Sequence, residues 1–172
     1  MKFSTSLSLV FCLFFLSSST QGQEVKEEAT LTTFVLIRHA EKRIDDPRNP
    51  SLNEEGVLRA QKLVELLQHS DVDVIYTTPY KRTQETVAPL ASKYSLTVQE
   101  YNPSKLAFLN EVWSNNQGKT IVISGHSNTT PMVANYLLGE EKFSQLDESE
   151  YDKVFVVTIN EIGKGTVSVL SY

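Results

Sequence analysis

Apolar and polar positions follow two periods along this chain, and the change from one period to the other separates the predicted elements. Leu31–Ile37 ends in a nearly continuous apolar run, which is typical of a strand covered on both faces. From Asn53 onward the period becomes helical, with Asn53 as a plausible N-cap and acids in the first turn. The expected apolar stripe of this first helix consists of Leu58, Leu63, Val64, Leu66 and Leu67.

The same alternation continues to the C-terminus. Short β-rich segments at 72–76, 96–100 and 120–124 predict three more strands. Three helices are expected between and after them. One has Thr78 as N-cap and Pro79 in its first turn and runs to about Tyr94, one covers 103–115, and one starts at Thr130–Pro131 and is stopped by Gly139. Residues 153–160 and 166–171 predict a closing hairpin.

This order of elements predicts an α/β fold, a three-layer α/β/α sandwich with a mostly parallel sheet and a C-terminal antiparallel hairpin. The chain has 172 residues, 40% of them hydrophobic, which suits one domain with a substantial core. The segments 42–50 and 140–152 are charged and irregular, and we expect them to be loops that form walls of a pocket.

The first 22 residues have the layout of a secretory signal peptide. Lys2 is followed by an apolar stretch at 7–16 and by small, polar residues up to Gly22. We therefore expect a signal peptide over 1–22, a leader over 23–30 and the domain over 31–172, with an uncleaved anchor as the alternative. The protein would be exported to the periplasm or the medium, with no stable membrane insertion after cleavage. Cys12 is the only cysteine, so the mature chain would have no disulfide.

The charge pattern bears on the partner. The net charge is −5 with acids and bases interspersed, which does not fit a nucleic-acid-binding surface. An anionic substrate would need a local basic cluster, and the strand ends supply one. Arg38 and His39 follow the first strand, Arg82 lies early in the helix after the second, and His126 follows the fourth.

The carboxyl ends of parallel strands meet at one edge of a sheet, where open α/β sheets place their sites. Arginine guanidinium groups match phosphate oxygens, and a neutral imidazole is a nucleophile toward phosphorus. We infer that His39 accepts a phosphoryl group that Arg38 and Arg82 hold, while His126 donates a hydrogen bond to it. This scheme requires no metal or cofactor.

Each residue alone also fits a structural role. Arg38 could extend to the surface, His39 could be a satisfied strand-end histidine, and Arg82 could be a solvated helix charge. Their joint position at matched strand ends favours the site. The third histidine, His69, is expected to complement the end of the first helix.

Four short motifs resemble those of the histidine phosphatase superfamily, whose fold is phosphoglycerate mutase-like. They are Arg38–Glu41 (RHAE), Leu52–Gly56 (LNEEG), Thr77–Pro79 with Arg82–Thr83, and Gly125–Thr129 (GHSNT). The resemblance covers roughly residue 33 to the C-terminus. It implies a phosphorylated His39 and a phosphate pocket that contains Arg38, Arg82 and His126. It also marks Lys42, Ser127 and Asn128 as candidate substrate ligands, with a merely solvated Lys42 as the alternative.

Two features depart from the mutase pattern. The family's proton donor follows the third strand region, where Glu100 is the only acid, and Glu100 also fits an ordinary strand position. Glu85 is expected to pair with Arg82 instead. The chain is also compact, which resembles the small branch of phosphohistidine phosphatases.

The resulting hypothesis is an exported, metal-independent phosphatase. It would act through phospho-His39 on monoesters or phosphoramidates, either small molecules or phosphoproteins. The alternatives are a phosphate-binding module without turnover and a phosphoglycerate mutase-type phosphotransferase.

Overall fold

The computed structural model describes residues 30–172. The predicted signal peptide over 1–22, its cleavage site and nearly all of the leader lie outside the described residues. Within residues 30–172, no helix is long and apolar enough to cross a membrane.

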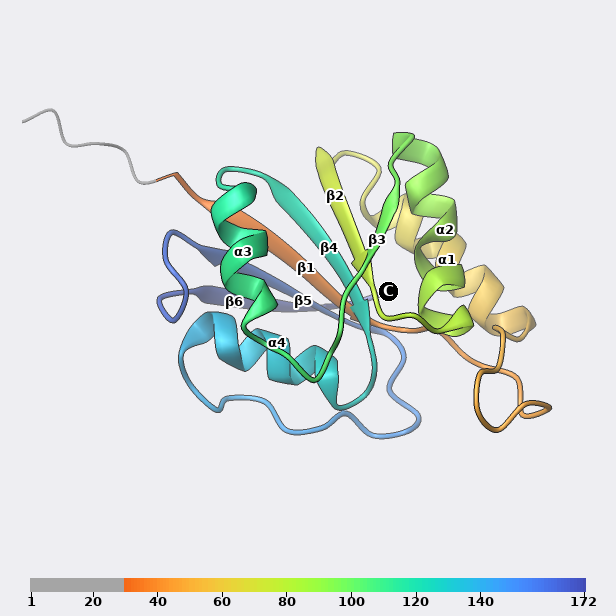
Figure 1. The fold of residues 1–172 in the computed structure, drawn as a ribbon. Helices are drawn as coiled ribbons and strands as arrows, with labels where there is room; N and C mark the ends of the chain where they lie inside the picture. The colour runs from red at the N-terminus through yellow and green to blue at the C-terminus, as the bar shows by residue number, and fades with distance from the viewer. Residues whose placement is uncertain (1–29) are drawn as a thin grey trace, which may run out of the picture.

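Six strands form a single mixed sheet in the order β3-β2-β4-β1-β5-β6 (Figure 1). The strands are β1 (Thr32–Arg38), β2 (Val72–Thr77), β3 (Val98–Glu100), β4 (Thr120–Gly125), β5 (Lys153–Ile159) and β6 (Thr166–Ser171). The β1, β2, β3 and β4 strands run parallel, whereas β5 pairs antiparallel with β1 and β6 pairs antiparallel with β5. The predicted mostly parallel sheet with a C-terminal antiparallel hairpin is confirmed.

Helices cover both faces of this sheet, so the predicted three-layer sandwich is also confirmed (Figure 1). The helices are α1 (Glu54–Leu66), α2 (Lys81–Tyr94), α3 (Phe108–Asn115) and α4 (Thr129–Leu138). Successive residues of β1 point to opposite faces. Phe34 and Leu36 pack in the core with α3 and α4, while Val35 and Ile37 pack in the core with α1 and α2. This two-sided burial explains the continuous apolar run at the end of β1.

The start of α1 agrees with its sequence signal, but part of the predicted apolar stripe does not. Asn53 is the N-cap, and its side chain accepts a hydrogen bond of 2.8 Å from the Gly56 amide. Leu63 is buried as expected, whereas Leu58 is 65% exposed. The buried face runs instead through Gly56 and Ala60. A side chain at Gly56 would overlap the backbone of Glu41, so the helix approaches too closely for large residues there.

Two helices start differently from their sequence signals because the threonines expected at their starts have other partners. The α2 helix starts at Lys81 with Tyr80 as N-cap, since the Thr78 hydroxyl lies 2.9 Å from Nε2 of His126. The α4 helix starts at Thr129 with Asn128 as N-cap, since the Thr130 hydroxyl donates to the Ile37 carbonyl of β1. Its C-cap is Gly139, as predicted, with a φ of 74°.

Two other elements, one strand and one helix, begin later in the chain than predicted, and a local hydrogen bond explains each difference. The β3 strand begins at Val98 because the Leu96 amide still bonds the Ala91 carbonyl at the end of α2. The α3 helix begins at Phe108 because the Asn102 side chain accepts a hydrogen bond from the Ser104 amide, which makes a turn where a helix was expected.

Candidate active site

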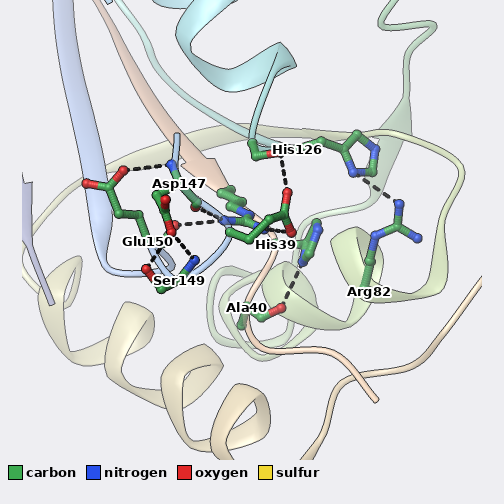
Figure 2. A network of polar contacts seen from close by, with 10 residues as sticks. His39, Ala40, Arg82, His126, Asp147, Ser149 and Glu150 are labelled. Atoms are coloured by element: carbon green, nitrogen blue, oxygen red, sulfur yellow. Dashed lines mark hydrogen bonds and ion pairs between the residues drawn. The ribbon is translucent and has the colours of Figure 1, made fainter. Parts of the chain in front are cut away.

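The pairing of β1 with β4 brings the two predicted histidines to the same edge of the sheet. Arg38 lies opposite Gly125 in the parallel register, and the His39 amide continues the pairing with a 2.9 Å bond to the Gly125 carbonyl. The ring centroids of His39 and His126 are 5.5 Å apart. Arg82 reaches His126 from the first turn of α2 (Figure 2). The structure therefore brings Arg38, His39, Arg82 and His126 together.

His39 is held in one tautomer. Its Nδ1 lies 2.8 Å from the carbonyl oxygen of Ala40 (Figure 2). A carbonyl only accepts, so Nδ1 carries the proton and Nε2 keeps its lone pair. The backbone amide of the same residue is also held, because the Ala40 N–H donates to the Thr86 hydroxyl at 2.9 Å.

The surroundings of His39 also keep its ring neutral. The residue is only 3% exposed. Burial lowers the pKa of His39 to about 3; the hydrogen bond to Ala40 opposes this effect, and the positive charges of Arg82 and Arg38 add to it. The imidazole is therefore uncharged at neutral pH, with the lone pair of Nε2 available.

His126 is neutral as well, but its ring nitrogens have partners within the site. Nη2 of Arg82 lies 3.3 Å from Nδ1, and a guanidinium only donates, so Nδ1 accepts. Nε2 then donates to the Thr78 hydroxyl at 2.9 Å. Burial lowers the pKa of His126 to about 4, with further lowering by Arg82 and Arg38. In this arrangement His126 positions Arg82, and its donation to a phosphoryl oxygen stays a prediction.

Arg38 is almost fully buried, at 1% exposure, and its partners come from the segment between α4 and β5. Nη1 donates to the carbonyl oxygens of Asp147 at 2.7 Å and Glu150 at 3.2 Å, and Nη2 bonds the Glu148 carboxylate at 3.0 Å. The guanidinium carbon lies 4.2 Å from the centre of the Tyr151 ring. Within residues 30–172, Nε of Arg38 and Nε of Arg82 are buried without hydrogen-bond partners. Each of the two guanidinium groups thus retains one N–H donor without an acceptor.

The motif glutamate after His39 has a structural role. The Glu41 carboxylate binds Arg59 of α1 through three contacts of 2.6 to 2.9 Å. Arg59 also donates to the backbone carbonyl of Tyr172 at 2.7 Å. This pair joins the end of β1 to α1 and to the last residue of the chain, which orients the loop that carries His39.

The other predicted ligands have different positions. The Ser127 hydroxyl lies 3.4 Å from the Glu148 carboxylate, and Asn128 lines a groove of about 350 Å³ beside His126. Lys42 forms a backbone bridge with Leu52, and within residues 30–172 its side chain has no hydrogen-bond or ion-pair partner.

The groove next to His126 has one unexpected wall. It is lined by Tyr80, Arg82, Pro103, Ser104, His126, Asn128, Thr129 and Met132. The predicted wall at 42–50 is not part of it, because that loop packs toward the start of α2, where the Asn49 side chain bonds the Lys81 amide. The turn that precedes α3 takes its place. The predicted wall at 140–152 instead closes the side of the site occupied by Arg38.

Both acids considered for proton donation have partners elsewhere. The Glu100 side chain accepts a hydrogen bond from Gln84 at 2.7 Å and is exposed in a separate cavity beside Tyr76. The expected pairing of Glu85 with Arg82 is wrong. The carboxylate of Glu85 accepts the Leu52 amide at 2.7 Å, because α2 packs beside the start of α1.

Sequence reasoning missed the groups that fix the two histidines and cover Arg38. These groups are Thr78, Thr86, Glu148 and Tyr151. The acidity of the 140–152 segment was the available signal, but its contacts with Arg38 join residues more than a hundred positions apart.

Comparisons with known proteins agree with this geometry. Residues 34–102 match the model of the histidine phosphatase superfamily (branch 1). Phosphoserine phosphatase 1 of Hydrogenobacter thermophilus is 34% identical over 74 residues, which are 40% of this chain and 35% of that protein. The match therefore spans about a third of the length of this curated relative.

Solved structures share the fold over most of the chain. A protein described as a phosphohistidine phosphatase SixA, from Nakamurella multipartitia, has a TM-score of 0.60 at 20% identity and covers 81% of this chain and 94% of its own. A protein histidine phosphatase SixA complexed with tungstate has a TM-score of 0.67 at 14% identity and covers 81% and 96%. The segment that matches the histidine phosphatase superfamily (branch 1) contains the Arg38–His39 motif and Arg82, and the fold shared with the solved structures covers 81% of this chain.

Proposed function

We propose that this protein is a metal-independent phosphatase that hydrolyses phosphate monoesters or phosphoramidates through a phosphohistidine intermediate at His39. The observation that carries this proposal is the tautomer of His39. The Ala40 carbonyl holds the proton on Nδ1, so the lone pair of Nε2 is available beside two guanidinium groups. A neutral, oriented imidazole next to fixed positive charge is what attack on a phosphoryl group requires.

The reaction has two displacements. The Nε2 lone pair of His39 attacks phosphorus, the bond from phosphorus to the substrate oxygen or nitrogen breaks, and the leaving group takes a proton from solvent. Water then attacks the phosphohistidine, the N–P bond breaks, and inorganic phosphate leaves a neutral His39. Arg38 and Arg82 hold the phosphoryl oxygens whose charge changes during both steps.

Loss of the nucleophile tests this proposal. We expect His39→Ala to lower kcat for p-nitrophenyl phosphate by about 1000-fold or more. The nitrophenolate leaving group needs no proton donor, so the assay is independent of that unassigned group. His69→Ala is the matched control, because His69 is exposed at the end of α1. Full activity of His39→Ala, or loss of wild-type activity in EDTA, would contradict the proposal.

A phosphate-binding module without turnover is the second candidate. It is favoured by the positions of Glu100 and Glu85, whose carboxylates bond Gln84 and Leu52 away from His39. The two functions differ in one product. The phosphatase forms an acid-labile phosphohistidine when it is quenched during turnover, whereas a binding module holds phosphate or vanadate and forms none.

Export is part of the proposal and rests on the signal-peptide pattern of residues 1–22. Mass spectrometry of the protein purified from its native source tests it. A mature N-terminus at Gln23 supports export, and an intact N-terminus in the cytoplasm contradicts it.

A further inference from the structure

The segment between α4 and β5 places a carboxylate against the guanidinium group of Arg38. One oxygen of Glu148 lies 3.0 Å from Nη2 of Arg38, and the other lies 3.4 Å from the hydroxyl of Ser127, the residue that follows His126. The carboxylate thus bridges two groups of the site. The segment is anchored here, since the Leu146 amide donates to the Ser127 carbonyl at 3.0 Å.

The two side chains of this ion pair differ in solvent exposure. The Arg38 side chain is 1% exposed, whereas the Glu148 side chain is 72% exposed. Arg38 is held by two backbone carbonyls and the Tyr151 ring, so it stays in place when Glu148 moves. In addition, Nε of Arg38 is buried and unpartnered within residues 30–172, which leaves a donor that Glu148 does not use. A phosphoryl group can therefore displace the carboxylate from Arg38.

When a phosphoryl group displaces Glu148 from Arg38, the Glu148 carboxylate loses the positive charge that balanced it. Arg38 and Arg82 carry two positive charges, and both histidines are neutral because their pKa values are lowered. A phosphate dianion offsets the two arginines. The Glu148 carboxylate then remains beside the phosphate as an excess negative charge, which repels an anionic substituent and attracts a cationic one.

We propose that Glu148 is a specificity-determining residue that selects substrates with a cationic group next to the phosphate. In the free protein its carboxylate bonds Arg38. When substrate binds, the phosphoryl group takes Arg38, and the carboxylate pairs with an ammonium or guanidinium group of the same substrate. This inference rests on the proposed phosphatase function and names its substrate class, a phosphorylated amine or a phosphorylated peptide with a neighbouring cation.

The test compares two substrates of nearly equal size. O-Phosphoethanolamine carries an ammonium group, and 2-hydroxyethyl phosphate has a neutral hydroxyl in its place. For the wild type we expect kcat/KM to favour O-phosphoethanolamine. In Glu148→Gln, kcat/KM falls about fivefold for O-phosphoethanolamine and rises for 2-hydroxyethyl phosphate, because the competing carboxylate is removed for both and the cation partner for only one.

Inorganic phosphate gives a second readout. Its inhibition constant falls in Glu148→Gln, because phosphate no longer displaces a carboxylate from Arg38. The matched control is Glu140→Gln, which removes the same charge from the same segment. The native Glu140 carboxylate pairs with Lys142 rather than with Arg38. Both variants change exposed side chains, so circular dichroism and the melting temperature are expected to match the wild type.

The outcomes separate this inference from the function it rests on. Equal changes for the two substrates in Glu148→Gln, or equal effects of Glu140→Gln, overturn the role of Glu148 even where p-nitrophenyl phosphate is hydrolysed. Absence of p-nitrophenyl phosphate turnover overturns the phosphatase function. In that case, competition of the same two phosphates for binding still decides whether Glu148 prefers the cation.

Discussion

The buried, neutral His39 makes the stability of the fold depend on pH in a predictable way. Its pKa falls from 6.5 in the unfolded chain to about 3 in the folded protein, chiefly because of burial. As the pH drops from 6.5 toward 3, the unfolded chain binds a proton at this histidine and the folded protein does not. Stability contributed by neutral His39 is therefore complete above pH 6.5 and is lost as the pH falls toward about 3.

His39→Asn removes this contribution while keeping a side-chain N–H for the Ala40 carbonyl. One pKa unit corresponds to about 1.4 kcal/mol, so protonation of His39 in the unfolded chain costs the wild type about 2.5 kcal/mol between about pH 7 and about pH 4.5. The free energy of unfolding of His39→Asn, relative to wild type, should rise by that amount over the same interval. Because His126 is present in both proteins, its own titration cancels in the comparison.

Urea denaturation at the two pH values measures this difference. His69→Asn serves as the control for loss of an exposed imidazole. If wild type and His39→Asn lose stability in parallel as the pH falls, His39 is not held neutral by the fold. The assignment of His39 as the nucleophile would then lose its electrostatic basis, the neutral state of the buried imidazole.

Three further substitutions test the structure around the site. Gly56→Ala would place a methyl group against the Glu41 carbonyl, and we expect a loss of about 2 kcal/mol in urea denaturation, with Gly56→Ser at least as unstable. Thr86→Val leaves the Ala40 amide buried without its acceptor, so stability should fall by about 1 to 3 kcal/mol and kcat should fall with it, while Thr86→Ser restores both. Arg38→Lys keeps the charge but loses the planar fork, and kcat/KM should fall about 100-fold; unchanged kinetics would contradict phosphate binding by this residue.

Much of the fold and the core of the site were predictable from local patterns. The apolar run that ends in Arg38 and His39 predicted a strand buried on both faces, and the parallel pairing of β1 with β4 brings its end to His126. Local capping signals worked where the side chain had no competing partner, as at Asn53 and Gly139. They failed at Thr78, because a histidine 48 residues away in the chain binds its hydroxyl.

The partners of the charged residues were not predictable in the same way. Spacing of one helical turn suggested that Glu85 pairs with Arg82, but the packed start of α1 offers Glu85 a buried amide at Leu52 instead. The partners of Arg38 come from a segment 109 to 112 residues further along the chain. No local pattern specifies a contact of that range, since it depends on how β5 and α4 close the sheet.

The amino-acid sequence by itself determined which groups reach the edge of the sheet: one arginine and one histidine from β1, an arginine from α2 and a histidine after β4. It did so because strand ends and their order follow from local periodicity and chain connection. Only the tertiary structure decided their chemical state. Burial and the nearby guanidinium groups keep His39 neutral, and the Ala40 carbonyl holds its proton on Nδ1 so that Nε2 is available. The Glu148 carboxylate, distant in sequence, binds Arg38. Solvation and charge are set by whatever the folded chain packs around each group.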